Sequence, residues 1–162
     1  MKLTLAERLA LRNQLQIMKE LEVGDLTAEQ YDEKIQIVEG GYEVYYPDLI
    51  NGINEEGIDP EVTAEVLDVL SLYRALHHAE QSGITLPSKG YAKFAGFDGN
   101  HEPHYGFSVF VLDVQGNFSE SAPSKNSHGS GALSRYRRML EAWDQMGRPF
   151  DLDQAAVDAI FA

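Results

Sequence analysis

The segment of residues 59–83 constrains the fold more than any other part of this sequence. Asp59 suits an N-cap, Pro60 suits the first position of a helix, and Gly83 follows a run that reaches Gln81. A helix whose apolar arc covers most of its circumference is buried on several sides, so we expect residues 62–81 to form the central helix of the molecule. The arc consists of Val62, Val66, Val69, Leu70, Tyr73 and Leu76, extended by Ala64, Leu67, Leu72, Ala75 and Ala79.

Two amphipathic segments at the N-terminus predict a helical hairpin. Thr4 with Glu7, and Thr27 with Gln30, have the spacing of a capping box at the start of a helix. We expect the first helix to end at Gly24 and the second at Gly40-Gly41. The hairpin has no cationic recognition face, which argues against DNA reading. The predicted apolar positions are Leu5, Leu9, Leu11, Leu15, Ile17 and Met18 in the first helix, and Tyr31, Ile35 and Val38 in the second.

A tyrosine-rich segment follows the hairpin, at residues 42–53. Its apolar spacing is helical, but Pro47 interrupts a continuous helix, so we expect two short helical turns with the second beginning at Pro47. The tyrosines suit a ligand wall or an interface, and they also suit core packing with hydroxyl groups at the rim. The sequence favours core packing.

The second half of the chain is harder to interpret. Residues 84–102 contain several glycines and prolines and are expected to be mostly loop. Residues 107–114 have the composition of a strand, yet their apolar spacing also fits a helix, and so short a run does not decide between them. A helix is predicted for residues 132–146, with Leu133, Tyr136, Leu140 and Trp143 on its core side, and a final helix capped by Asp151.

The charge of the chain is strongly negative and unevenly distributed. The formal net charge is −13, and residues 1–70 account for −11 of it, with five basic and sixteen acidic residues. Such a surface repels phosphate backbones, so a nucleic acid partner is disfavoured. A basic protein or a divalent cation is compatible with the acidic stretch of residues 39–68, although a solvated surface is the simpler interpretation.

Composition also bears on the compartment. The chain has no cysteine, which excludes disulfides and thiolate metal sites, and charged residues at Glu7, Arg8 and Arg12 do not fit a secretory leader. No apolar run approaches the roughly 20 residues that span a bilayer. We therefore expect a cytoplasmic protein that does not enter the membrane.

Several polar clusters of the second half of the chain have some of the residues that a binding site needs. His101-Glu-Pro-His lacks the spacing of the zinc signature, and the segment that starts at Asp98 lacks the glycine and the final carboxylate of a calcium loop. A turn capped by its own Asp98 and Asn100 is the favoured interpretation, with no metal or cofactor. The glycines of residues 126–131 and the arginines that follow, Arg135, Arg137 and Arg138, suit an anion site less well than a flexible linker with a solvated basic face.

Five segments together resemble the YfbU-like family of uncharacterised bacterial proteins, and their order and spacing are kept from the first helix to the last. The resemblance implies an all-helical fold, which favours a helix for residues 107–114, and it implies no activity and no catalytic residues. The segments are Glu7-Arg-Leu-Ala-Leu-Arg-Asn-Gln, Ile37-Val-Glu-Gly-Gly-Tyr, Glu65-Val-Leu-Asp-Val-Leu-Ser-Leu-Tyr-Arg-Ala-Leu, Phe94-Ala-Gly-Phe-Asp-Gly-Asn and Tyr136-Arg-Arg-Met-Leu-Glu-Ala-Trp.

We therefore predict an all-α protein with an N-terminal helical hairpin at residues 1–40 and a multihelical body at residues 41–162. The first hypothesis is a non-enzymatic interaction or regulatory protein that is a homo-oligomer, because the hairpin needs a partner to cover its apolar stripe. The alternative is a small-molecule-binding protein or enzyme with a pocket near Asp98 and His77. Its candidate ligand or interface residues are Tyr73, His77, Asp98, Asn100 and Glu102.

Overall fold

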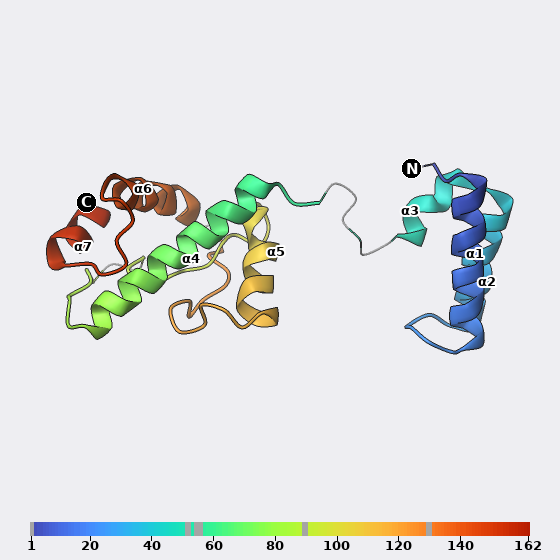
Figure 1. Ribbon diagram of the computed structural model, residues 1–162, viewed down its shortest axis with the longest axis horizontal. Coiled ribbons are helices and arrows are strands. Elements are labelled where there is room, and N and C mark those ends of the chain that lie inside the picture. The colour runs from blue at the N-terminus through green and yellow to red at the C-terminus, as the bar shows by residue number, and fades with distance from the viewer. Residues whose placement is uncertain (1, 51–52, 54–56, 89–90, 129–130) are drawn as a thin grey trace. The chain divides into compact units, whose positions relative to one another are not determined.

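The computed structural model describes residues 2–50, 53, 57–88, 91–128 and 131–162, and within these ranges the fold is all-α, as predicted. Seven α-helices are joined by one 3-10 turn and one π-helical turn, and the described residues contain no strand beyond a single isolated bridge between Phe97 and Asn126. The chain forms two compact units, Met1–Glu55 and Glu56–Ala162, each with its own hydrophobic core (Figure 1).

The first unit is the predicted hairpin together with the turns that follow it. Both capping boxes are present, at Thr4 with Glu7 and at Thr27 with Gln30. The unit consists of α1 (Leu5–Glu20), α2 (Ala28–Gly40), the 3-10 turn η1 (Glu43–Tyr45) and α3 (Tyr46–Leu49). The predicted boundary followed residue 40, and residues 42–50 pack with the hairpin in the structure, where Lys34 Nζ donates to the Asp48 carbonyl at 2.7 Å.

The end of α1 differs from the prediction. We expected Gly24 as the left-handed residue, but the helix ends at Glu20 and the left-handed position is taken by Glu22, with φ of 52°. Val23 N donates to the Met18 carbonyl at 3.1 Å, which closes the Schellman motif around Glu22. Gly24 is required for a different reason, because a Cβ there would lie 2.6 Å from the Tyr31 hydroxyl oxygen.

The tyrosine-rich segment is helical, and its second turn begins at Tyr46, one residue before Pro47. The predicted core packing holds for Tyr46, which is buried, whereas Tyr42 and Tyr45 are exposed. Residues 51–52 of this predicted segment lie outside the described residues.

The second unit is built around α4 (Pro60–Gln81), which has the predicted cap at Asp59. The helix is central, as expected, although Ala64 and Leu67 of the predicted arc are exposed. In Figure 1, α4 crosses the unit, and α5 and α6 both pack against it. Its buried residues are Val66, Val69, Leu70, Leu72, Tyr73, Ala75, Leu76 and Ala79.

Residues 107–114 are helical, in agreement with the family resemblance and against their strand propensity. They belong to α5 (His104–Val109) and the π-helical turn η2 (Phe110–Val114). Val111 and Leu112 enter the core, which explains the apolar run that suggested a strand.

The last two helices complete the unit. α6 (Ala132–Gln145) buries Tyr136, Leu140 and Trp143 as predicted, and it packs against α7 (Gln154–Ile160). The cap of α7 is Asp153 rather than Asp151, because Leu152 is buried in the core and helical backbone starts only after it.

The loop of residues 91–98 is fixed within the core of the second unit. Tyr136 Oη accepts a hydrogen bond from Ala95 N and donates to the Gly96 carbonyl, both at 3.0 Å. Gly96 has φ of 90°, and a Cβ there would lie 2.1 Å from the carbonyl carbon of Lys125. This close contact accounts for the glycine in the Phe94-Ala-Gly-Phe segment. Tyr136 is itself buried, and its burial raises the pKa of its hydroxyl group to about 12.

Candidate functional site

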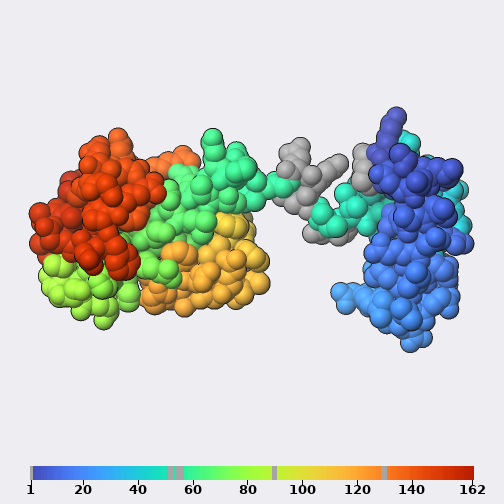
Figure 2. Space-filling model, viewed as in Figure 1, coloured from blue at the N-terminus to red at the C-terminus, as the bar shows by residue number. Residues whose placement is uncertain are grey.

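The outward face of α1 is the most unusual surface of the first unit. The helix packs Leu11, Leu15 and Met18 into the hairpin core with Tyr31, Ile35 and Val38. Four other large apolar side chains of the same helix and its C-cap face water, and Figure 2 shows α1 in dark blue on the surface of this unit. They are Leu5, Leu9, Ile17 and Leu21, with exposed fractions of 78%, 59%, 57% and 65%. The sequence placed Leu5, Leu9 and Ile17 on the core stripe, and this part of the prediction was wrong.

These exposed side chains form a single row along the helix. Leu5, Leu9, Asn13, Ile17 and Leu21 are each four residues apart, so they follow one of the natural ridges of a helix surface, inclined by about 26° to its axis. One side of the row borders Arg12, Gln16 and Glu20. The residues on its other side are exposed and uncharged like the row itself: Ala6, Ala10 and Gln14. We call the row together with Ala6, Ala10 and Gln14 the α1 face, and none of these eight residues is ionisable.

The basic residues of α1 lie outside the α1 face, where the hairpin uses them. Arg8 donates from Nε to the Val38 carbonyl at 2.8 Å and from Nη2 to the Glu39 carbonyl at 2.6 Å. These bonds satisfy carbonyl groups at the end of α2 that have no partner within the helix. The positive charge of Arg8 also stabilises the negative end of the helix dipole, since α2 has no basic residue in its last turn.

Two ion pairs complete the contact between the helices. Arg12 pairs with Glu39 at 3.0 Å, and Lys19 pairs with Asp32 at 2.7 Å. The hydrogen bond to Asp32 raises the pKa of Lys19. The cations of α1 are thus engaged inside the hairpin, which leaves the α1 face uncharged.

In the second unit, three of the predicted site residues come together in one turn. Asp98 Oδ1 accepts a hydrogen bond from Asn100 N at 3.0 Å, its Oδ2 lies 2.7 Å from His101 Nδ1, and Glu102 Oε2 accepts from Asp98 N at 2.7 Å. The bond from the Asn100 amide, and then the one from His101, lower the pKa of Asp98. Asp98 therefore organises its own turn, as the favoured interpretation of the sequence proposed.

Tyr73 and His77 lie in another place on α4. Tyr73 Oη donates to the Tyr91 carbonyl at 2.8 Å, and burial raises the pKa of this phenol. His77 is half-buried and lines, with Tyr73 and Glu80, a hollow of about 120 Å³ whose lining does not include Asp98 among the described residues. The structure thus divides the five predicted residues into two separate groups.

A cluster that the sequence did not reveal joins three helices of the second unit. Glu65 on α4 receives two hydrogen bonds from Arg137 of α6, at 2.6 and 2.9 Å, and lies 2.7 Å from Nε2 of His104 on α5. The Arg137 bonds, with a smaller contribution from His104, lower the pKa of Glu65 in spite of its partial burial. The partners are 39 and 72 residues away in the chain, and no local motif signals such a contact.

His104 is almost completely buried and stacks on Phe97, with ring centroids 5.2 Å apart. Its Nδ1 is buried without a hydrogen-bond partner among the described residues. The contact with Glu65 requires a proton on Nε2, because a carboxylate only accepts hydrogen bonds. The cluster is a clamp between helices, since its histidine does not reach solvent.

The acidic side chains in the described part of the chain do not gather into a metal site, and the three predicted arginines do not form one shared anion site. Among the described residues, no three acidic or histidine side chains are placed to hold a metal ion. The three arginines near the start of α6 do not act together, because Arg137 binds Glu65 while the Arg135 guanidinium lies 5.3 Å from the Tyr91 ring centroid. Residues 129–130 of the predicted glycine loop lie outside the described residues.

No helix within the described ranges combines the length and the apolarity needed to cross a membrane.

Comparison with known proteins extends over the full chain. The family model described as the YfbU domain matches residues 1–162. The UPF0304 protein MJECS11 of Methanocaldococcus jannaschii is 34% identical over 164 aligned positions, which cover 93% of this chain and 94% of that protein. The family is uncharacterised, and the resemblance found in the five sequence segments is confirmed: this chain belongs to the YfbU family.

Proposed function

We propose that the protein is a non-enzymatic interaction protein that acts as a homodimer, joined through the α1 faces of two copies. The observation that carries this proposal is the uncharged row of exposed apolar side chains on α1. Full burial of one leucine or isoleucine side chain contributes roughly 1.5–3 kcal/mol, so four of them on each copy provide a substantial driving force for association. Contiguous apolar surface on an otherwise polar helix is typical of interaction sites.

The order of residues in the row favours a second copy as the occupant. The row has the same kind of residue at equal distances on either side of Asn13. Large aliphatic side chains lie four residues away, at Leu9 and Ile17, and eight residues away, at Leu5 and Leu21. In an antiparallel pair related by a two-fold axis at Asn13, Leu9 meets Ile17 of the partner and Leu5 meets its Leu21. A two-fold interface requires this kind of self-complementary surface.

Helix packing is consistent with this pairing. Ridges of residues spaced by four interdigitate when two helices cross at about −50°, and the closest contact is then at the centre of the row. Asn13 then faces the same residue of the partner at the crossing point. Leu9 and Ile17 on either side of it are the principal apolar contacts, and Leu5 and Leu21 lie where the helices diverge. The exposed Ala6 and Ala10 beside the row allow a close approach of the two backbones.

Charge also selects a second copy. Two chains with a net charge of −13 repel each other, and they associate with least repulsion through a face without ionisable groups. A basic partner would instead prefer the carboxylates of α2, two of which, Asp32 and Glu39, already pair with α1. The acidic side of the hairpin is therefore the weaker basis for an interaction.

Sedimentation velocity of the purified chain at 5–200 µM tests the proposal, because the dimer has twice the mass of 18.1 kDa. The double variant Leu9→Lys, Ile17→Lys places four cations at the centre of the interface and is expected to sediment as a monomer. The matched control is Val44→Lys, which changes another highly exposed apolar residue of the same unit outside the row and should remain dimeric.

Far-UV circular dichroism checks that the variants keep their helical content. A wild-type chain that remains monomeric at the highest concentration would contradict the proposal. An equal loss of dimer in the Val44 control would also contradict it, because association would then not depend on the α1 face.

A further inference from the structure

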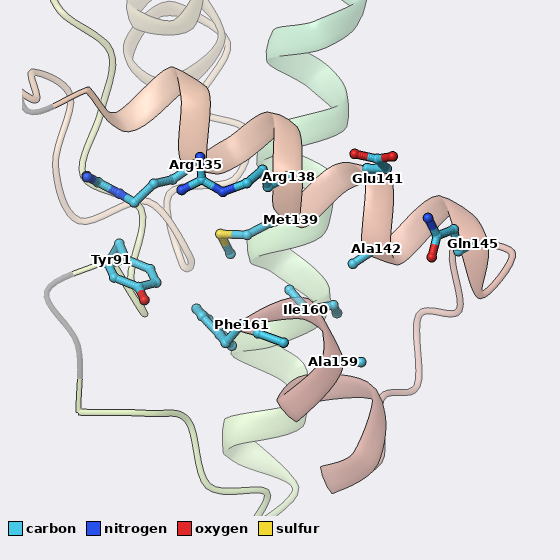
Figure 3. A pocket seen from close by; sticks show the side chains of 11 residues that line it. Tyr91, Arg135, Arg138, Met139, Glu141, Ala142, Gln145, Ala159, Ile160 and Phe161 are labelled. Carbon is cyan, nitrogen blue, oxygen red and sulfur yellow. The ribbon is translucent and has the colours of Figure 1, made fainter.

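A pocket in the second unit lies between α6, α7 and Tyr91, with a volume of about 390 Å³ (Figure 3). Pockets that bind small organic molecules have volumes of about 300–1,000 Å³, so this one admits a compact ligand. None of the residues proposed from the sequence as a pocket near Asp98 and His77 lines it.

The base of the pocket is apolar. Met139, Ile160 and Phe161 line it and are themselves buried, so their packing fixes its shape. The rings of Tyr91 and Phe161 lie 5.9 Å apart at an angle of 36°. Two aromatic rings at this spacing offer a planar ligand an edge or a face to pack against.

One end of the pocket is cationic. Arg135 and Arg138 lie one helical turn apart, and Figure 3 shows both side chains at the Tyr91 end, with Glu141 and Gln145 at the other. The nearest charges around a ligand at this end are thus positive, although the protein as a whole is acidic. Beyond about 8 Å the field of distant carboxylates is largely screened at physiological ionic strength.

Arg138 differs from its neighbour Arg137 in its partners. Arg137 forms two hydrogen bonds with Glu65, whereas no carboxylate in the described part of the chain forms an ion pair with Arg138. Like charges one turn apart repel each other and destabilise a helix slightly. A bound anion would turn the repulsion into attraction, since a guanidinium group matches the two oxygens of a carboxylate.

We propose that this pocket binds a small aromatic carboxylate. The ring of the ligand packs on Tyr91 and Phe161 above the apolar base, and its carboxylate lies between the guanidinium groups of Arg138 and Arg135. The proposal does not depend on dimerisation, because every residue that it uses belongs to the second unit and none lies on α1.

Three probes separate the two parts of this recognition. Benzoate carries the ring and the charge, benzyl alcohol carries the ring alone, and inorganic phosphate carries charge alone. Titrations followed by the ¹H–¹⁵N spectrum of the intact chain should show saturable shifts of the Ala142 and Phe161 amides with benzoate. Benzyl alcohol and phosphate should each bind at least tenfold more weakly at the same amides.

Arg138→Gln tests the cationic end, and Lys125→Gln, which removes an exposed cation of the same unit that does not line the pocket, is the matched control. The first should raise the dissociation constant of benzoate at least tenfold, and the second should leave it within twofold. Thermal melting confirms that both variants are folded. Equal binding of phosphate and benzoate would overturn the role of the rings, and unchanged benzoate binding in Arg138→Gln would overturn the site.

Discussion

The two compact units of this chain bury their helices to different extents. In the second unit, α4 has eight buried residues and lies within a core that α5, α6 and α7 complete. In the first unit, α1 has a single fully buried residue, Leu15, and its opposite side presents four large apolar side chains to water. The second unit therefore buries a large apolar cluster in its own core, whereas the first unit presents an apolar row of α1 to water.

The difference follows from the number of elements available. A helix covered on one side by a single partner has half of its surface in water, and the residues there are normally polar. On α1 that side carries four large apolar residues, interrupted only by uncharged polar residues at Asn13 and Gln14 within the α1 face, which is why we assign the assembly function to the first unit and the ligand site to the second.

Core truncations should give the largest effects and should separate the two units. Leu70→Ala is expected to lower the free energy of unfolding of the second unit near the upper end of the ~2–5 kcal/mol range for such changes, because its site is fully enclosed. Leu15→Ala should cost nearer the lower end, because its cluster is small and partly exposed.

Urea unfolding followed by two signals measures both. The only tryptophan, Trp143, lies in the core of the second unit, so its fluorescence reports that unit, while circular dichroism reports both. If Leu15→Ala shifted the fluorescence transition as much as Leu70→Ala, the two units would not be energetically separate.

The helix clamp of the second unit should give a medium effect. Glu65→Gln removes the carboxylate that both Arg137 and His104 contact. We expect the free energy of unfolding to fall by only about 1–2 kcal/mol at pH 7, because the solvent exposure of Arg137 weakens its ion pair. Tryptophan fluorescence should shift, and the far-UV signal of the first unit should keep its transition. Glu61→Gln, an exposed residue on the first turn of the same helix, is the control.

The same carboxylate should make the second unit sensitive to acid. The folded pKa of Glu65 lies below its usual value of 4.5, so its stabilising contribution is complete above about pH 4.5 and is lost as the pH falls through the folded pKa. The urea midpoint by fluorescence should therefore fall between pH 5 and pH 3, and it should fall less in Glu65→Gln. An identical fall in both proteins would assign the acid sensitivity to other carboxylates.

The smallest effect concerns the first unit alone. Glu22→Gly places glycine at a position with φ of 52°, and relief of the left-handed conformation should stabilise the hairpin by about 0.5–1 kcal/mol. Hydrogen exchange of the last amides of α1 should slow accordingly. Faster exchange at these amides would show that the Glu22 side chain contributes more than its backbone conformation costs.

Local chemistry made much of the fold predictable. The capping boxes at Thr4 and Thr27 and the Asp59-Pro60 start of α4 depend on residues within a few positions of each other, and all of them were confirmed. The apolar arc of α4 was confirmed except at Ala64 and Leu67, which are exposed. The start of α7 was missed by two residues, because the choice between Asp151 and Asp153 depends on the burial of Leu152 between them.

The candidate sites were less predictable. Asp98, Asn100 and Glu102 form one turn because they are neighbours in sequence, but grouping them with Tyr73 and His77 required a knowledge of how α4 meets the loop. The pocket between α6 and α7 escaped notice for the same reason, since Tyr91, Arg138 and Phe161 have no common motif.

The sequence by itself determined where α1, α2, α4 and α6 begin, which helix is central, and that the chain is an acidic all-α member of its family, because these properties depend on local backbone chemistry and composition. Only the tertiary structure decided which side of α1 faces α2. The apolar residues of that helix extend around much of its circumference, and the positions of Arg8 and Lys19, fixed by their bonds to α2, select Leu11, Leu15 and Met18 for the core. Leu5, Leu9 and Ile17 lie outside this contact with α2 and are exposed.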